Sequence, residues 1–391
     1  MDRVREALYL PEDPARIGVD GSGVRIAVID TGIDASHPDL VDSVSVAQSR
    51  VFGLGGSIDD HVGHGTHVAG IIAGSGAASE GRYRGIAPGA ELIALKALAD
   101  GRGYTDDVAA AIFHAIELGV DIINYSASHS PWRIAGGGPP WKWSTHLTVR
   151  DEAFQAAVEA GILCVGAAGN DGPHEGSINS PGILSELLTC GALTESGEEL
   201  ASISSRGPAY LDDSLAPNQV VSRVDIFDTD LRTRKKPNLV APGAAPGMHS
   251  GSIANRFLGP GHVPLGPVSA RSRDAKYLRC VEPSDPDCLY ARMGGTSQAT
   301  AVVTGLAALV LQLGREWNIP WERPQGEVLR KLLEAAAVQM TAYSPDEVGN
   351  GRLLWPTLLG NIEDYRDSDV RRANILDGPQ LRLEGEAEPD A

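Results

Sequence analysis

Short apolar runs alternate with amphipathic stretches along the first half of this chain, and this alternation limits the folds that it can form. The first run, VRIAVI at residues 24–29, is apolar at nearly every position, which is typical of a strand buried on both faces of a parallel sheet. Similar runs lie at residues 92–95, 120–123, 162–165 and 187–193. Stretches with helical spacing lie at residues 68–73, 105–118 and 149–160. We therefore predict an α/β fold, a doubly wound, mostly parallel sheet flanked by helices in three αβα layers.

A further helix is predicted after Thr296, where apolar residues occur on almost every side. A helix of this kind is buried through the middle of a domain. We predict one large domain over residues 21–360, with an N-terminal extension at 1–20 and an acidic C-terminal tail at 361–391. Long loop insertions, rich in Gly, Pro or polar residues, are predicted at about residues 130–145, 208–236 and 244–292.

Charge and composition argue against several classes of partner. The 33 Lys and Arg residues face 51 Asp and Glu residues, and the net charge of −18 argues against nucleic acid, whose phosphates require clustered basic residues. No apolar run approaches the ~20 residues that span a bilayer. No apolar stretch follows the charged residues at the start, as it would in a secretory signal. We therefore predict a cytoplasmic location without a membrane span.

Four cysteines in a chain of 391 residues do not form a disulfide framework. Cys164 and Cys190 lie inside apolar runs, where a free thiol acts as a small buried hydrophobic group. Cys280 and Cys288 flank a polar, turn-rich stretch. These two residues can close a small disulfide loop, and the sequence leaves open whether they do.

Four short motifs carry residue types that can perform chemistry together. Asp30 in DTG follows the first predicted strand, at the sheet edge where reacting groups gather in open α/β folds. His64 lies in GHGTHVAG at the start of a helix of small residues, and Ser297 lies in GGTSQAT at the start of the long apolar helix. Asn170 in AAGN ends another predicted strand.

An aspartate, a histidine and a serine are the groups that nucleophilic acyl transfer requires. A serine hydroxyl needs a base to take its proton, and the histidine imidazole is suited to that exchange near neutral pH. A buried carboxylate, here Asp30, holds the imidazole of His64 in the useful tautomer. Ser297 at a helix N-terminus adds a backbone N–H for a developing oxyanion, and the amide of Asn170 can supply a second donor.

The motifs DTG, GHGTHVAG, AAGN and GTSQAT together resemble the signatures of the subtilisin family of serine peptidases. The order Asp, His, Ser along the chain is the subtilisin order. The stretches GIAPGAELIALKAL, ASISSRGP and KKPNLVAPG are also similar, so the resemblance covers roughly residues 15–359. It implies an Asp30–His64–Ser297 triad with Asn170 in the oxyanion hole. The implied function is a serine endopeptidase that hydrolyses peptide bonds in a protein or peptide substrate, with a selective processing role.

The resemblance also implies where an extended peptide binds, between two strand edges. One edge carries Gly101, Arg102, Gly103 and Tyr104, and the other carries Ser126, Ala127 and Ser128. The family is richer in glycine at the second edge. Asp171 falls at the rim of the family's specificity pocket, and together with the negative net charge it motivates the hypothesis of a basic residue before the cleaved bond.

No cofactor is required by this chemistry, and a weak structural calcium ion remains an alternative. The loop at residues 75–84 lacks the oxygen-rich pattern of the family's strong calcium site, while Asp39 can still serve as one ligand. His61, His64 and His67 are spaced by three residues, but no carboxylate or cysteine set accompanies them, so we predict no metal site there.

Two other function classes remain open at this level. In one, the chain is a catalytically silent pseudo-protease that binds peptides through its insertions. In the other, the same triad serves a non-peptide acyl hydrolase. The intact Asp30, His64, Asn170 and Ser297 argue against the first alternative, and the peptide-binding edge at residues 101–103 argues against the second.

Overall fold

The computed structural model describes residues 1–12, 18–53, 55–128, 148–211, 232–248, 266–275, 278–281, 286–319, 324–368 and 375. The predicted insertion at residues 130–145 lies outside these ranges. Residues 212–231 and 249–265 of the other two predicted insertions and most of the predicted tail also lie outside them.

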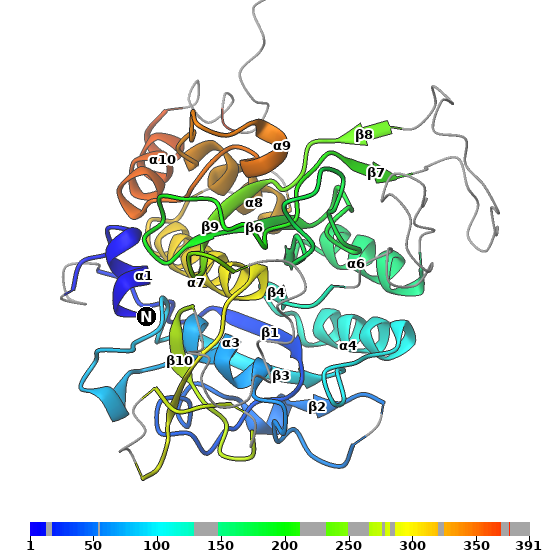
Figure 1. The fold of residues 1–391 in the computed structure, drawn as a ribbon, viewed down its shortest axis with the longest axis vertical. Helices are drawn as coiled ribbons and strands as arrows, with labels where there is room; N and C mark the ends of the chain where they lie inside the picture. Colours follow the sequence, from blue (N-terminus) through cyan, green and yellow to red (C-terminus); the bar gives the residue numbers. More distant parts are fainter. Residues whose placement is uncertain are drawn as a thin grey trace, which may run out of the picture.

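A seven-stranded sheet forms the centre of the molecule, in the order β2-β3-β1-β4-β5-β6-β9, and all its neighbouring strands pair in parallel (Figure 1). Its strands are β1 (Arg25–Asp30), β2 (Arg50–Val51), β3 (Glu91–Lys96), β4 (Ile122–Tyr125), β5 (Leu163–Ala167), β6 (Leu188–Thr194) and β9 (Leu239–Ala244). Five of these confirm the predicted strands. The two outermost strands, β2 and β9, were not predicted.

Helices cover both faces of the sheet, as predicted. On one face lie α4 (Thr105–Leu118) and α6 (Val149–Glu159), and on the other lie α3 (His64–Ala73) and α7 (Thr296–Glu316) (Figure 1). Next to α7 lie α8 (Gln325–Ala336), which also contacts β5, and α10 (Trp355–Asp367), which contacts both α7 and α8. The strand β1 is buried on both sides. Ile26 and Val28 join the core under α3 and α7, whereas Ala27 and Ile29 join the core under α4 and α6.

The helix α7 confirms the predicted central helix. It is long and apolar enough to cross a membrane by length and composition, but its most apolar 18-residue window is 100% buried within the protein. It contacts β4, β5, β6 and β9, and this burial accounts for its apolar residues on every side. The helix is therefore a core element.

The predicted insertions contain two small antiparallel hairpins. In the second insertion, β7 (Ala209–Leu211) pairs with β8 (Arg232–Arg234), and in the third, β10 (Val268–Ala270) pairs with β11 (Tyr290–Arg292). Cys280 and Cys288, between β10 and β11, form a disulfide with Cα atoms 5.2 Å apart. Cys164 and Cys190 are buried free thiols, as predicted.

Both ends of the described chain pack onto the domain. The helix α1 (Asp2–Ala7) contacts β9, and Val4 and Leu8 are buried in the core below α7. The helix α10 crosses the predicted boundary at residue 360, because Ile362 and Tyr365 are also buried there. The remaining short elements are α9 (Pro345–Val348) and two 3₁₀ turns, at Val46–Gln48 and Ala77–Ser79.

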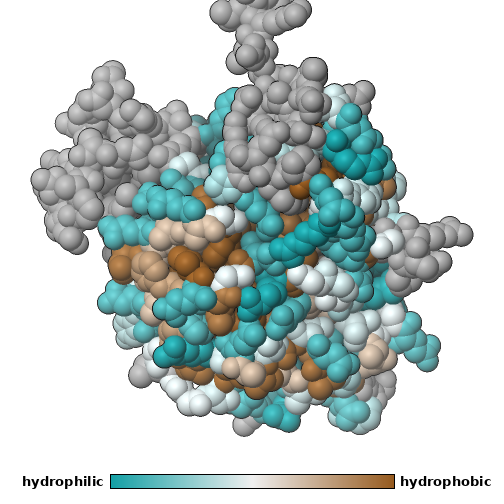
Figure 2. Space-filling view, turned by 180° about the vertical axis from the view of Figure 1, so that it is seen from behind, coloured by the Kyte–Doolittle hydropathy of each residue, from teal (hydrophilic) through white to brown (hydrophobic). Residues whose placement is uncertain are grey.

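The face behind the view of Figure 1 carries a mixed surface. Hydrophobic residues there gather in small groups that hydrophilic residues separate (Figure 2). This pattern is ordinary for a folded domain, whose surface always retains some apolar area.

Candidate active site

Asp30 lies at the carboxyl end of β1 and is completely buried. Its Oδ1 accepts a hydrogen bond from the backbone N–H of Thr31 at 2.7 Å and pairs with Nδ1 of His64 at 2.7 Å. Since a carboxylate can only accept, Nδ1 carries the imidazole hydrogen and Nε2 is left with its lone pair. The predicted pair of Asp30 and His64 is therefore formed, with the tautomer that a general base requires.

His64 is the first residue of α3 and is 6% exposed. The following residue, Gly65, lies so close to β1 that an added Cβ would be 3.1 Å from Cβ of Asp30. A side chain at residue 65 would push α3 away from the strand. The sequence Gly-His-Gly thus lets the helix approach the carboxylate closely enough for the 2.7 Å hydrogen bond.

Ser297 is the second residue of α7, where backbone N–H groups have no partner within the helix. No described residue accepts a hydrogen bond from its N–H, which remains available to an anion. Its hydroxyl donates to the carbonyl oxygen of Ser126 at 2.8 Å, and the Ser126 hydroxyl donates back to the Ser297 carbonyl at 2.9 Å. Within the described part of the chain, no hydrogen bond joins Ser297 to His64, and the Ser297 hydroxyl is instead engaged by the Ser126 carbonyl.

Asn170 lies beside the start of α7. Its Oδ1 accepts hydrogen bonds from the N–H of Thr296 at 2.9 Å and from the Thr296 hydroxyl at 3.1 Å. These two donors fix the orientation of the amide, because Nδ2 cannot take the place of an acceptor. Nδ2 therefore faces away from Thr296, and it has no acceptor among the described residues.

The two predicted peptide-binding edges lie at the same end of the sheet. Residues Gly101–Tyr104 follow β3 and Ser126–Ser128 follow β4, with β1 between these strands. Tyr104 is 71% exposed, whereas Ser126 is buried against Ser297. Ser128 accepts a 3.4 Å hydrogen bond from Nδ2 of Asn179, which links the second edge to the segment after Asn170. Asp171 is half-buried, and its N–H donates to the Ser205 hydroxyl.

Asp60 accepts hydrogen bonds from residues on both sides of His64 and from Thr31, and this role was not predicted from the sequence. Its Oδ1 accepts from the Thr31 hydroxyl, the Val62 N–H and the Gly63 N–H, at 2.8, 3.1 and 2.7 Å. Its Oδ2 accepts from the N–H and hydroxyl of Thr66, at 2.9 and 2.8 Å. Burial raises the pKa of Asp60, and these donors oppose that rise. A carboxylate four residues before His64, in a turn with glycine, was the sequence signal for this role.

His61 and His67, the other two histidines of the three-residue spacing, form no described hydrogen bond with Asp30, His64 or Ser297. His67 is completely buried, and burial lowers the pKa of its imidazole to about 3, so it is neutral at physiological pH. His61 is exposed and lies 3.7 Å from Asp274. Within the ranges that the structure describes, no group of three His, Cys, Asp or Glu side chains gathers in a metal-binding arrangement.

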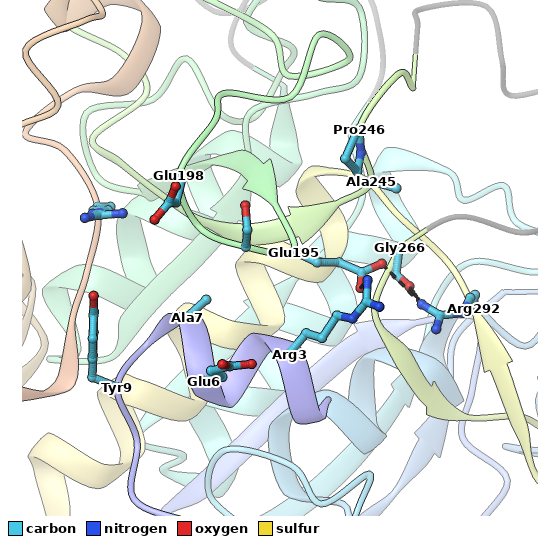
Figure 3. A pocket seen from close by; sticks show the side chains of 12 residues that line it. Arg3, Glu6, Ala7, Tyr9, Glu195, Glu198, Ala245, Pro246, Gly266 and Arg292 are labelled. Atoms are coloured by element: carbon cyan, nitrogen blue, oxygen red, sulfur yellow. Dashed lines mark hydrogen bonds and ion pairs between the residues drawn. The ribbon is translucent and has the colours of Figure 1, made fainter.

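A separate cavity of about 730 Å³ lies between α1 and the loops that follow β6 and β9 (Figure 3). Three of its charged residues are paired, because Glu195 lies 3.2 Å from Arg292 and 3.9 Å from Arg3. Arg292 also donates to the carbonyl of Gly266 (Figure 3). No triad residue lines this cavity, so it is distinct from the candidate active site.

Comparison with known proteins gives consistent matches. The sequence profile of the subtilase family matches residues 21–354. The serine protease AprX of Bacillus subtilis is 31% identical over 309 residues, which cover 75% of this chain and 58% of that protein. An intracellular serine protease of Paenibacillus polymyxa is 36% identical over 385 residues, 93% of this chain and 88% of that protein.

Solved structures agree with the sequence matches. Sphericase superposes with a TM-score of 0.58 at 28% sequence identity, over 86% of this chain and 92% of sphericase. The protease domain of PatA gives the same TM-score at 21% identity and supports the fold alone. This chain belongs to the subtilase family, the subtilisin-like serine peptidases.

Proposed function

We propose that this chain is a serine endopeptidase in which Ser297 attacks the peptide carbonyl and His64 takes the hydroxyl proton through Nε2. The observation that carries the proposal is the 2.7 Å hydrogen bond between Asp30 and His64, because it commits Nδ1 as a donor and leaves Nε2 as the base. Asp30 then stabilises the imidazolium, which returns the proton to the leaving amine.

Two donors are proposed to hold the oxyanion of the tetrahedral intermediate. One is the N–H of Ser297 at the start of α7, where the positive end of the helix dipole adds to its effect. The other is Nδ2 of Asn170, whose orientation is fixed by the two hydrogen bonds from Thr296 to Oδ1. Both donors are set before the substrate arrives, so no reorganisation energy is spent during the reaction.

A peptide substrate is proposed to lie as an added strand between the edge at Gly101–Gly103 and the edge at Ser126–Ser128. Such a substrate would displace the contact between the Ser297 hydroxyl and the Ser126 carbonyl, because that carbonyl belongs to the peptide-binding edge. The Ser297 hydroxyl would then be released to turn towards His64. Substrate binding and nucleophile activation are thus coupled in this proposal.

A selective processing role with a basic residue before the cleaved bond is the finer part of the proposal. Asp171 supplies a half-buried carboxylate, and nearby Asn179 has a buried Oδ1 with no partner among the described residues. Both oxygens can accept hydrogen bonds from a Lys or Arg side chain. Cleavage rates of matched peptides that differ only in this residue test the preference. Equal rates for Lys or Arg and for Leu or Phe would refute it, and Asp171→Asn should reduce the ratio.

The Ser297 hydroxyl donates to the Ser126 carbonyl and not to His64, and a catalytically silent peptide-binding protein could have the same arrangement. This alternative therefore needs a direct test. A fluorophosphonate reacts only with an activated serine. Labelling of the purified chain that disappears in Ser297→Ala supports the peptidase, and absence of labelling supports the silent alternative. A non-peptide acyl hydrolase would be labelled too, but it would cleave esters and leave casein intact.

The contacts of Asp39 argue against the weak structural calcium ion that the sequence left open there. Its Oδ1 accepts from the N–H of Ala78 at 2.9 Å and its Oδ2 accepts from the Tyr290 hydroxyl at 2.7 Å. Both carboxylate oxygens are thus occupied by protein donors in a residue that is 2% exposed. We propose that the fold is stable without calcium. An unchanged melting temperature in EDTA supports this proposal, and a large fall that calcium reverses would refute it.

The cytoplasmic location predicted from the sequence stays a prediction. A relative that is named as intracellular is consistent with it. The disulfide between Cys280 and Cys288 opposes it, because disulfides persist mainly in oxidising compartments. Alkylation of thiols in freshly lysed cells, followed by mass analysis of the peptides with these cysteines, would decide between the two.

A further inference from the structure

The connection from β10 to β11 is closed by the disulfide between Cys280 and Cys288, and we call its described residues 271–275, 278–281 and 286–289 the bridged loop. Arg271 organises this loop from inside. Its guanidinium donates to the carbonyls of Ala275 and Leu278, at 2.8 and 2.9 Å, and its N–H donates to the Leu289 carbonyl at 2.8 Å. The two halves of the loop are thus joined covalently at one point and by hydrogen bonds at others.

The bridged loop lies against the turn that leads into His64. The Ser272 hydroxyl donates to the Asp60 carbonyl at 2.6 Å, and the N–H of Arg273 donates to the Asp34 carboxylate at 3.0 Å. Both anchors are on the catalytic side of the domain. Asp60 holds the residues on either side of His64, and Asp34 follows the strand of Asp30.

The contact nearest to the catalytic residues is made by Leu278 and Ala275 on Gly63. Gly63 is the N-cap of α3 with φ of 89°, directly before His64. A Cβ added to Gly63 would overlap Cδ1 of Leu278 and lie 2.7 Å from Cβ of Ala275. The two side chains therefore close over the Gly63 backbone without a gap. Gly63 cannot move outward unless Leu278 moves first.

Gly63 in turn determines where α3 begins. Its N–H donates to Asp60 at 2.7 Å and its carbonyl accepts from the His67 N–H in the first turn of the helix. A displacement of Gly63 therefore displaces the first helical residue, His64. A shift of about 1 Å in a reacting group is enough to reduce a rate by about 10²-fold.

We propose that Leu278, held in place by the Cys280–Cys288 disulfide, is a positioning residue for His64, so that reduction of this disulfide slows acylation of Ser297. The inference rests on the proposed triad. A dithiol would reduce the bridge by two thiol–disulfide exchanges: the Cys280–Cys288 bond is broken, each cysteine gains one electron and one proton, and the dithiol becomes a cyclic disulfide. Cys280 is two residues from Leu278, so the bridge restrains the segment of Leu278 in addition to the hydrogen bond that the Leu278 carbonyl accepts from Arg271.

The test measures the second-order rate of fluorophosphonate labelling of Ser297 and the kcat and KM for one peptide. For the oxidised wild type treated with a dithiol, we expect labelling and kcat to fall by about 10- to 100-fold, with KM changed less than threefold. The double variant Cys280→Ser/Cys288→Ser should be as slow as the reduced protein and should not respond to the dithiol. Its melting temperature and circular dichroism show whether it folds.

A second pair of variants keeps the test independent of the cysteines. Leu278→Ala should reproduce the loss of kcat in the oxidised protein, and Leu278→Met, which keeps the volume over Gly63, should restore it. A merely structural role would lower the melting temperature without separating kcat from KM.

The failures of the two proposals are distinguishable. If Ser297 is labelled at equal rates in oxidised and reduced protein and Leu278→Ala keeps its kcat, the positioning role is refuted while the triad stands. If Ser297 is labelled in neither form, the proposed peptidase activity fails and this inference fails with it.

Discussion

Replacing Asp60 by Asn changes one oxygen of a buried carboxylate into an NH₂ group and leaves the shape of the side chain unchanged. The Asp60 side chain is the acceptor in all five of its hydrogen bonds. The hydroxyls of Thr31 and Thr66 each already accept from a backbone N–H, that of Gly65 or Asp34. A hydroxyl that also accepted from the new NH₂ group would have to turn its own hydrogen away from Asp60. Whichever oxygen is replaced, the NH₂ group also faces a backbone N–H, which can only donate.

The size of the effect follows from which oxygen is replaced. The least costly arrangement keeps the amide oxygen at the position of Oδ1, with its three donors, and places NH₂ at Oδ2, where two donors from Thr66 lose their acceptor. A hydrogen bond to a charged group contributes about 1.5–3 kcal/mol, so we expect a loss of about 3–6 kcal/mol in the free energy of unfolding. The turn at Val62 and Gly63 should also loosen, and kcat should fall by about 10- to 100-fold.

The unfolding assay is best done in a Ser297→Ala background, where self-digestion cannot distort the result. Urea unfolding followed by fluorescence gives the free energy, and kcat is measured in the otherwise wild-type chain. Asp59→Asn is the matched control. Its carboxylate is partly exposed and accepts a hydrogen bond from the Ser57 hydroxyl, so its loss should cost less than about 1 kcal/mol.

An Asp60→Asn variant that is as stable and as active as the parent would refute this reasoning. It would mean that Asp60 carries a proton in the folded protein, since a neutral carboxyl and an amide would then be nearly equivalent. The rise in the pKa of Asp60 that burial causes would then exceed what an ionised carboxylate allows at the pH of the assay.

Three further predictions concern single residues. Asn170→Ala should lower kcat by about 10²–10³-fold with little change in KM, a magnitude taken from subtilisin itself. An unchanged kcat would show that Asn170 is not part of the oxyanion hole. Burial lowers the pKa of His67 to about 3 in the folded chain, against 6.5 in the unfolded chain, so the unfolded state binds more protons below pH 6.5. In urea titrations, Ser297→Ala protein should therefore lose about 2 kcal/mol of its free energy of unfolding from pH 7 to pH 5. The same protein with His67→Asn should lose less. Gln298 is buried next to Ser297 in the chain and cannot form a sulfoxide. The activity of the wild type should therefore survive mild peroxide that inactivates the Gln298→Met variant. Equal loss of activity in the wild type and the variant would contradict this.

The central layers could be predicted from the sequence because burial on both faces leaves a clear signal. The run VRIAVI alternates between two cores, with Val28 under α7 and Ile29 under α4, so every position except the half-buried Arg25 is apolar. The edge strand β2 has only two residues, one exposed and one half-buried, and therefore carries no such run. The strand β9 is buried throughout, but its Pro and Gly interrupt the pattern that indicates a strand.

The sequence predicts the side chains proposed to react, but not the residues that hold these side chains in place. Asp30, His64 and Ser297 stand in motifs whose residue types are rare in combination, and each motif lies at the end of a predictable strand or helix. The support from Asp60 depends on which donors surround the carboxylate in space. Thr31 and Thr66 are ordinary residues in the sequence, and only the fold brings their hydroxyls to the same side chain.

The contact of the bridged loop with the start of α3 could not be predicted from the sequence, because the residue that the loop contacts is a glycine. Gly63 has no side chain whose polarity or size could indicate a contact. Leu278 is a single leucine in a stretch without helical or strand periodicity. Yet a positive φ at Gly63 and the absence of space for a Cβ make this the point where the loop bears directly on the catalytic helix. If the geometry of His64 depends on that contact, then the third insertion acts on the proposed triad through its backbone supports.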